Sequence, residues 1–248
     1  MQALPLILVP GLMCDHAVWA PVLPWLSGSR TCTVVDHGSA ASLQQMARQI
    51  LDATPGRMLL AGHSMGARVV LEAQRLAPGR ISGVALLDTG YLTRPAGPAG
   101  LAEEQKRLAL LQIAREHGVR VMAREWVQGM VDADRLGDVE LIDRIVEMFA
   151  RKSADVFACQ IQALLARPDG CDMLRALAVP TLILCGAQDA WSPLAQHQAM
   201  QAMAPSAVLE VIDHAGHMAP MERPREVAQA LDRWLASCES SSLLACEL

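Results

Sequence analysis

Short apolar segments alternate with amphipathic segments along most of the chain. Four of the apolar segments are nearly continuous aliphatic runs, a pattern typical of parallel strands whose two faces are both covered. Between them, apolar residues recur at the three- and four-residue spacing of helices. The predicted strands are residues 5–11, 31–38, 57–64, 81–88, 180–186 and 207–213, and the helices between them 43–53, 64–76, 193–203 and 224–236. This alternation predicts an α/β fold, with a mostly parallel sheet of about six core strands flanked by helices.

One interval breaks this alternation. About ninety residues separate the strand that ends at Asp88 from the strand that begins near Thr181, several times the usual length of a connection. Residues 93–100 have the composition of a linker, and four helical patterns follow it, at residues 101–117, 119–131, 138–152 and 153–167. We therefore expect a helical cap, residues 93–170, inserted into an α/β core formed by residues 1–92 and 171–248. The last twelve residues are expected to form a frayed tail.

Composition excludes several classes of protein. With 52% hydrophobic and 19% charged residues, the chain can form a sizeable core, which excludes general disorder. The formal charge of −5 and the absence of a Lys/Arg-rich run leave no surface pattern suited to nucleic acid. No uncharged apolar stretch reaches the roughly 18–20 residues that a membrane span needs. The first residues also lack the basic region and cleavage site of a signal peptide.

The seven cysteines are scattered along the chain and form no C-x-x-C pair. This favours thiols in a reducing cytoplasm over a disulfide framework or a zinc site. No G-x-G-x-x-G, P-loop or H-E-x-x-H motif is present, so we expect neither a cofactor nor a metal. The sequence thus predicts a cytoplasmic globular protein, a monomer or homodimer, without nucleic-acid or membrane partners.

The clearest chemical signal is the pentapeptide GHSMG at residues 62–66, a G-x-S-x-G motif. It lies where a predicted strand passes into a predicted helix. A serine on such a sharp turn has its hydroxyl exposed above the sheet, and the crowded backbone leaves room only for small residues two positions before and after it. Ser64 is therefore a candidate nucleophile at a helix N-terminus, where developing negative charge is favoured.

A serine hydroxyl needs a general base, and the base needs a group that orients it. Two later strand ends supply such groups: CGAQD ends at Asp189, and HAGH ends at His217. The chain order Ser64, Asp189, His217 is that of one class of hydrolases. His63 and His214 are alternative bases and Asp88 is an alternative orienting acid. We expect His63 to be a structural hydrogen-bonding residue.

These motifs together resemble those of the α/β-hydrolases, in the capped branch that includes carboxylesterases, lactonases and C–C hydrolases. The matching segments span nearly the whole chain: VPGL at 9–12, GHSMG at 62–66, LCGAQDAWSP at 184–193 and HAGHMAPMERP at 214–224. The resemblance implies that Ser64 is the nucleophile, His217 the general base and then acid, and Asp189 the residue that orients His217. It also implies an oxyanion hole formed by the backbone N–H groups of Leu12 and Met65.

The chain departs from the family pattern in three places. Pro10 stands where a histidine is common, but the expected donor lies two residues later. The chain begins directly with the first core strand rather than with a hairpin, so we expect about six strands rather than the family's eight. Met218 follows His217, where C–C hydrolases commonly carry tryptophan.

Candidate substrate-binding residues lie in the cap and beside His217. Apolar residues at helical spacing face either the cap interior or the pocket below it, and the bulkiest are Trp126, Met130, Met148 and Phe149, with Met218 from the core. In the loop after the first strand, Met13 and Cys14 are further candidates for substrate contact, whereas Trp19 is expected in the core. Asp36 and His37 are expected in a solvated loop.

The sequence therefore predicts a serine hydrolase of small to medium, largely apolar esters or lactones, with charged and polymeric substrates poor. A C–C bond hydrolase or a cofactor-free, base-catalysed enzyme on the same fold is the alternative. A non-catalytic ligand-binding protein is a further one, against which the complete set of Ser64, Asp189 and His217 argues.

Overall fold

A parallel sheet occupies the centre of the computed structural model, which describes residues 3–28 and 30–244. Within these residues the sheet has six strands in the order β2-β1-β3-β4-β5-β6, and every neighbouring pair is parallel. The strands are β1 (Leu6–Val9), β2 (Cys32–Val34), β3 (Met58–His63), β4 (Ile81–Leu87), β5 (Thr181–Gly186) and β6 (Val208–Ile212). The predicted fold class and strand number are confirmed.

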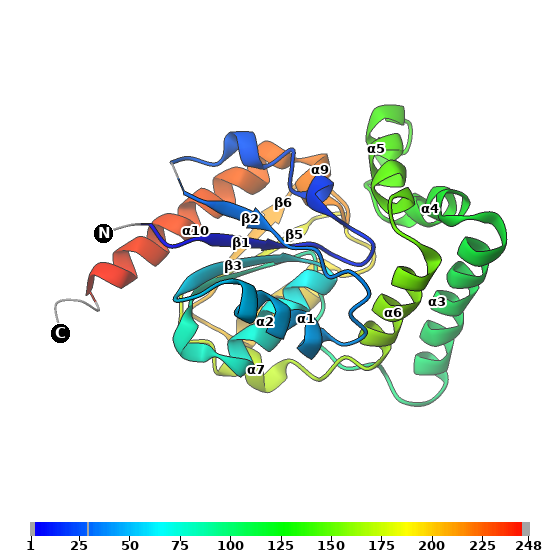
Figure 1. The fold of residues 1–248 in the computed structure, drawn as a ribbon. Helices are drawn as coiled ribbons and strands as arrows, with labels where there is room; N and C mark the ends of the chain where they lie inside the picture. The colour runs from blue at the N-terminus through cyan, green and yellow to red at the C-terminus, as the bar shows by residue number, and fades with distance from the viewer. Residues whose placement is uncertain (1–2, 29, 245–248) are drawn as a thin grey trace.

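Helices cover both faces of the sheet (Figure 1). On one face, α2 (Met65–Leu76) packs against the central strands and α1 (Leu43–Ala53) packs against α2, while α8 (Leu194–Met203) covers β5 and β6. On the other face, α10 (Pro224–Leu244) packs against β4, β5 and β6. The four inner strands β1, β3, β4 and β5 are buried along their whole length. Coverage on both faces explains why these strands are continuous apolar runs rather than alternating ones.

The C-terminal helix extends further than predicted. The pattern predicts a helix that ends at residue 236 and a frayed tail, but α10 continues to Leu244. The hydroxyls of Ser240 and Ser241 each donate to the carbonyl four residues earlier, at 3.0 Å, so these side chains are bonded to the helix itself. Arg30 also forms an ion pair with Glu239. The rest of the predicted tail, residues 245–248, lies outside the described residues.

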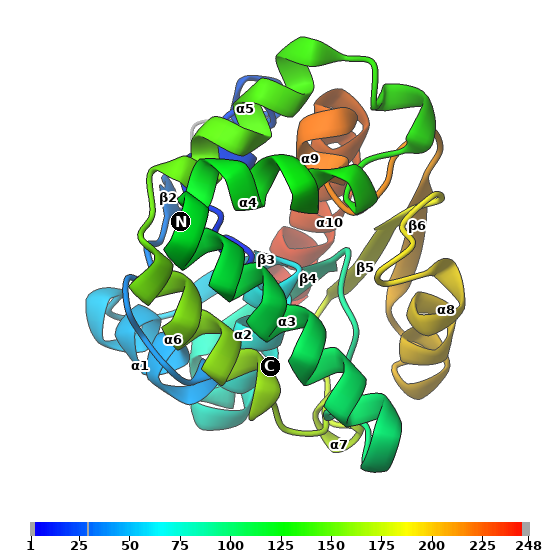
Figure 2. The ribbon, with the colours of Figure 1, turned by 90° about the vertical axis from the view of Figure 1, so that its right-hand side faces the viewer.

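Four helices lie beyond the carboxyl ends of the strands, between β4 and β5 in the chain (Figures 1 and 2). Helix α3 begins inside the segment that resembles a linker, with Pro98 in its first turn, a position that proline tolerates. The predicted helix 119–131 is instead a shorter α-helix followed by the 3₁₀ turn η4. The elements are α3 (Gly97–His117), α4 (Val119–Trp126), η4 (Val127–Gly129), η5 (Ala133–Arg135), α5 (Val139–Ala150) and α6 (Ala154–Leu165), and α7 (Cys171–Arg175) follows.

The segments between β1 and α1 contain three residues for which the sequence predicts a degree of burial. Trp19 is fully buried, as predicted. His37, expected in a solvated loop, is buried as well, whereas its neighbour Asp36 is exposed and forms an ion pair with Lys152 at 2.9 Å. The remaining short helices are η1 (His16–Val18), η2 (Leu23–Trp25), η3 (Pro78–Arg80) and α9 (Ala219–Glu222). Among the described helices, none combines the length and the apolar character that crossing a membrane requires.

Candidate active site

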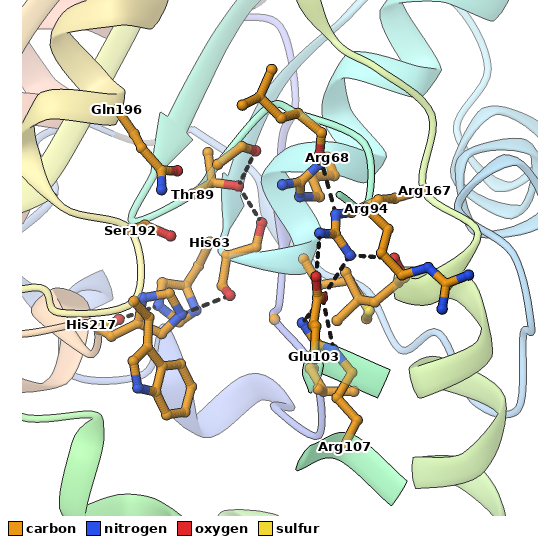
Figure 3. Close-up of a pocket in the computed structure, with 18 of the residues that line it drawn as sticks. His63, Arg68, Thr89, Arg94, Glu103, Arg107, Arg167, Ser192, Gln196 and His217 are labelled. Atoms are coloured by element: carbon orange, nitrogen blue, oxygen red, sulfur yellow. Dashed lines mark hydrogen bonds and ion pairs between the residues drawn. The ribbon is translucent and has the colours of Figure 1, made fainter. Parts of the chain in front are cut away.

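A cavity of about 670 Å³ lies between the carboxyl edge of the sheet and helices α3–α6 (Figure 3). From the sheet side it is lined by Leu12, Ser64, Met65, His217 and Met218. From the other side it is lined by Trp126 of α4, Phe149 of α5 and Met130, which follows η4. Cys14 also lines it. The cavity therefore brings together most of the residues that the sequence singles out for chemistry or substrate contact.

Two of the candidate contact residues do not reach this cavity. Met148 is fully buried and is absent from the cavity lining, because successive residues on a helix point about 100° apart and its neighbour Phe149 takes the facing position. Met13 is also fully buried, and its backbone N–H donates to the Gln160 side chain at 2.8 Å.

Ser64 occupies a strained turn between β3 and α2. Its φ of 54° and ψ of −118° lie in a region that non-glycine residues rarely adopt. The chain is so crowded there that a Cβ at Gly66 would lie 2.1 Å from the Val9 carbonyl oxygen, and one at Gly62 would lie 2.5 Å from Ala67. The small residues of the G-x-S-x-G motif are thus a steric requirement.

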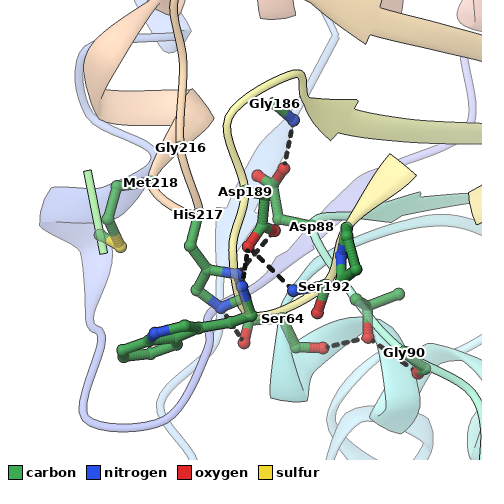
Figure 4. Close-up of polar contacts among 12 residues, drawn as sticks. Ser64, Asp88, Gly90, Gly186, Asp189, Ser192, Gly216, His217 and Met218 are labelled. Carbon is green, nitrogen blue, oxygen red and sulfur yellow. Dashed lines mark hydrogen bonds and ion pairs between the residues drawn. The ribbon is translucent and has the colours of Figure 1, made fainter. Parts of the chain in front are cut away.

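Ser64, His217 and Asp189 form a continuous hydrogen-bonded chain (Figure 4). The Ser64 Oγ lies 2.8 Å from the His217 Nε2, and the His217 Nδ1 lies 2.8 Å from the Asp189 Oδ2. Ser64 comes from the turn after β3, Asp189 from the loop after β5 and His217 from the loop after β6. Because parallel strands end at the same edge of a sheet, three residues far apart in the chain meet there.

The Asp189 carboxylate is held in place by its own loop. Its Oδ1 accepts the backbone N–H groups of Trp191 and Ser192, at 2.8 and 2.9 Å. Burial pushes the pKa of Asp189 upward, but the His217 charge, the hydrogen bond from His217 and these backbone bonds outweigh it and leave the pKa below its usual value. Asp189 is therefore an ionised acceptor for His217.

The alternative acid, Asp88, and the alternative bases, His63 and His214, are not part of this hydrogen-bonded chain. Asp88 is fully buried, and its Oδ1 accepts the Gly186 N–H at 2.9 Å (Figure 4). Burial, and then the nearby charge of Asp189, raise the pKa of Asp88 well above its usual value. His63 points its Nε2 at the carbonyl oxygen of His217, 2.8 Å away, and burial lowers its pKa to about 3. His214 is exposed and is not part of the cavity lining.

The model of the alpha/beta hydrolase family matches residues 6–230 of the chain. The chain belongs to this family. A pimeloyl-[acyl-carrier protein] methyl ester esterase of Methylococcus capsulatus is 26% identical over 246 residues, 93% of this chain and 94% of that protein. A thermophilic esterase from Thermogutta terrifontis, solved with malate bound, is 28% identical, with a TM-score of 0.79 over 96% of this chain and 91% of its own.

The enol-lactonase from Burkholderia xenovorans LB400 shares the fold of this α/β-hydrolase. Its TM-score is 0.81 at 20% identity, over 95% of this chain and 92% of its own. The predicted family is confirmed, and with it the prediction that the protein is an enzyme of the α/β-hydrolase type whose relatives act on ester bonds.

Two backbone N–H groups of the hydrolase are available beside Ser64. The loop after β1 approaches closely enough that a Cβ at Gly11 would lie 3.1 Å from the Ser64 Cβ. Leu12 in this loop and Met65 at the start of α2 both line the cavity. Within the described residues, neither of their N–H groups donates a hydrogen bond to the protein.

Two polar side chains that sequence reasoning missed join helices α3–α6 to the loops around Ser64 and His217. Gln160 of α6 accepts the Met13 N–H and donates to the Gly38 carbonyl at 3.2 Å. Glu222 of α9 accepts N–H groups from the His217 loop and from the segment after η4. One of two glutamines in a largely apolar helix and an acid five residues after His217 are the sequence signals for these roles.

The cavity also has a charged wall, whereas the sequence predicts only apolar residues from the cap in its lining. Four arginines and one glutamate line it: Arg68, Arg94, Arg107, Arg167 and Glu103. Arg68 follows Ser64 by four positions, and this helical spacing is the sequence signal for its placement. Among the described residues, no group of three or more His, Cys, Asp or Glu side chains is arranged to hold a metal ion.

Proposed function

We propose that this protein is a serine hydrolase that cleaves a small to medium ester or lactone through an acyl-enzyme. The observation that carries the proposal is the chain of two 2.8 Å contacts from Ser64 Oγ through the His217 ring to Asp189. A nucleophile in hydrogen-bond contact with a base, and a base oriented by a carboxylate, are the groups that this reaction needs.

In the acylation step, Ser64 Oγ attacks the substrate carbonyl carbon while its proton passes to His217 Nε2. The carbonyl oxygen becomes an oxyanion, which the N–H groups of Leu12 and Met65 stabilise. The intermediate collapses, the bond to the leaving oxygen breaks, and His217 returns the proton to that oxygen. An alcohol leaves, or in a lactone the ring opens, and the acyl group remains on Ser64.

In the deacylation step, water replaces the alcohol. His217 Nε2 takes a proton from the water as its oxygen attacks the acyl carbon, and the same two N–H groups bind the second oxyanion. His217 then protonates Ser64 Oγ as the carboxylic acid departs. The Asp189 carboxylate stabilises the imidazolium in both steps, because it accepts the hydrogen bond from the His217 Nδ1–H throughout and remains ionised.

Several observations support an ester or lactone as the substrate. The similar proteins include a methyl ester esterase and an enol-lactonase. Trp126, Met130, Phe149 and Met218 form an apolar part of the lining that suits the carbon chain of such a molecule. The expectation that charged substrates are poor fits this part of the lining but not the arginines that also line the cavity. The scattered cysteines support a cytoplasmic location.

Covalent labelling tests the proposal directly. A fluorophosphonate probe at pH 7–8 should label wild-type protein on Ser64, and Ser64→Ala should abolish both labelling and the hydrolysis of p-nitrophenyl esters. The expected loss in turnover is roughly 10⁴–10⁶-fold, while the melting temperature stays unchanged. A Ser64→Ala protein that keeps a tenth of wild-type activity would refute the nucleophile. Substrate turnover without labelling would instead favour a base-catalysed reaction that does not use Ser64.

A further inference from the structure

The charged wall lies at the end of the cavity opposite His217 (Figure 3). Four arginines and a single carboxylate line the cavity, so the charges of its lining are unbalanced. A cavity of this kind attracts anions, because its low-dielectric walls focus the field of the fixed charges.

Three of the four arginines have carboxylate partners. Glu103 accepts hydrogen bonds from Arg107 at 2.9 Å and from both terminal nitrogens of Arg167, at 2.7 and 2.8 Å. Arg94 pairs with Glu104 at 2.6 Å. These pairs hold the wall together and give each of these three guanidinium groups a carboxylate partner, although Arg107 and Arg167 share the single charge of Glu103.

Arg68 differs from the other three. Its Nη1 donates to the Leu92 carbonyl oxygen at 3.0 Å, but within the described part of the chain Arg68 forms no ion pair. Burial, followed by the charge of Arg167, lowers the pKa of Arg68 to about 9. A half-buried cation without a counter-ion is costly, and an anion bound beside it removes much of that cost.

The position of Arg68 places this cation within reach of a substrate on Ser64. Arg68 follows Ser64 by four residues on α2, which is about 6 Å along the helix axis. The space in front of it is kept open by Gly90, where a Cβ would lie 3.0 Å from the Arg68 Nη2 and 2.7 Å from the Gln196 Oε1. A guanidinium group presents paired N–H donors that match the two oxygens of a carboxylate.

We infer that Arg68 binds a carboxylate at the far end of the substrate's acyl group, so that the enzyme prefers monoesters of dicarboxylic acids, or lactones bearing a carboxylate, over neutral esters. This inference rests on the proposed function, since it uses the direction of proton transfer. His217 must reach the leaving oxygen, so the leaving group lies at the His217 end of the cavity. The acyl chain then extends toward the opposite end, where Arg68 lies.

A pair of substrates of equal size isolates the charge. Monomethyl adipate carries a carboxylate, and methyl 6-amino-6-oxohexanoate carries a neutral amide in its place. Proton release measured in a pH-stat gives kcat/KM for both. The wild-type enzyme should prefer the acid by about tenfold or more, and Arg68→Gln should reduce this preference to about one. A change of roughly 10- to 100-fold is expected for the loss of hydrogen bonds to a charged group.

Arg120→Gln is the matched control. Arg120 lies on α4, pairs with Glu147 at an exposed position and does not line the cavity. The Arg120→Gln substitution removes the same charge as Arg68→Gln but at a distant site. It should therefore leave the ratio of kcat/KM between the two substrates as in the wild type. An equal effect of both variants would mean that the preference comes from the overall charge rather than from Arg68, and would overturn the inference.

Two further measurements separate this inference from the proposed function. Calorimetric titration of Ser64→Ala with free adipate should detect binding that is lost in Ser64→Ala/Arg68→Gln. Equal rates on both esters, with no Arg68-dependent adipate binding but normal fluorophosphonate labelling, would overturn the carboxylate site and leave the hydrolase intact. An Arg68-dependent preference for 4-acetoxybutanoate over monomethyl adipate would place the carboxylate on the alcohol and overturn the acyl assignment.

If the enzyme hydrolyses no ester and Ser64 is not labelled, the proposed function fails. Adipate titration of the wild type and Arg68→Gln then decides the anion site by itself. Binding that depends on Arg68 supports it, and binding unchanged by the substitution overturns it.

Discussion

Glu222 accepts the backbone N–H of Asp132 at 2.8 Å through its Oε2. Its other oxygen accepts the N–H groups of Gly216 and Met218, at 2.9 and 3.2 Å, and these residues flank His217. The backbone N–H of His217 also donates to the Met130 carbonyl oxygen at 2.7 Å. The segment after η4, which joins the helices over the cavity, is therefore bonded to the loop that carries His217.

Glu222→Gln should weaken this connection without removing bulk. A glutamine has one oxygen where the carboxylate has two, so an N–H group on one side meets the amide NH₂ instead of an acceptor. We expect a loss of about 1–3 kcal/mol in the free energy of unfolding and a clear fall in kcat. Urea denaturation and the turnover of p-nitrophenyl esters measure the two effects. Glu226→Gln, on the half-exposed surface of α10, is the control and should change neither.

Asp189→Asn should reduce kcat by roughly 10³–10⁴-fold. An asparagine favours the wrong tautomer of His217, and it has no charge with which to stabilise the imidazolium that forms during the reaction. Asp88→Asn should stay within about threefold of the wild type, since the asparagine oxygen can still accept the Gly186 N–H. Ester hydrolysis by both variants, with melting temperatures recorded, tests the assignment. The reverse order of effects would make Asp88 the orienting acid.

Acid should destabilise the protein through its buried histidines. Burial lowers the pKa of His37 to about 4, so between pH 6.5 and 4 the unfolded chain takes up a proton that the folded protein does not. The contribution of His37 to stability is present above pH 6.5 and is lost as the pH falls. From pH 7 to pH 5 this amounts to about 2 kcal/mol.

The comparison of wild type with His37→Gln isolates this effect, because the raised pKa values of buried Asp88 and Glu222 act in the opposite direction but are common to both proteins. Urea denaturation at pH 7 and pH 5 should show a smaller loss for His37→Gln than for the wild type. Equal losses would mean that His37 is protonated in the folded state.

Trp126→Ala should change the dependence of kcat/KM on acyl chain length. The Trp126 ring packs against Phe149 and Trp191, with ring centroids 5.3 and 5.5 Å apart, and it lines the cavity. Burying one methylene is worth about 0.8 kcal/mol, roughly fourfold in kcat/KM. A p-nitrophenyl ester series should peak near about four to eight carbons in the wild type and flatten in Trp126→Ala. Trp25→Ala, at an exposed site outside the cavity, is the control, and a flat wild-type profile would contradict an apolar acyl site.

Local patterns in the sequence determine the elements of this fold. The buried strands are recognisable because coverage on both faces demands continuous apolar runs, and the helices because one face must be apolar. The G-x-S-x-G motif is equally local, since the steric demands at Gly62 and Gly66 come from the turn itself. Ser64, Asp189 and His217 each follow a recognisable apolar strand, so their order at three strand ends can also be predicted from the sequence.

Contacts between distant segments decide what local patterns leave open. Asp88 and Asp189 both follow apolar strands, and only the packing of the loops after β5 and β6 places Asp189 against His217 and buries Asp88. Met148 and Phe149 are equivalent in an apolar helix until its packing decides which one faces the cavity. Arg68 is one of three charged residues in α2. Within the described residues it forms no ion pair, because Glu103 of α3 pairs instead with Arg107 and with Arg167, which follows α6. Helical periodicity shows which face of a helix is covered, but not which residues cover it. The charged wall of the cavity therefore becomes visible only in the tertiary structure.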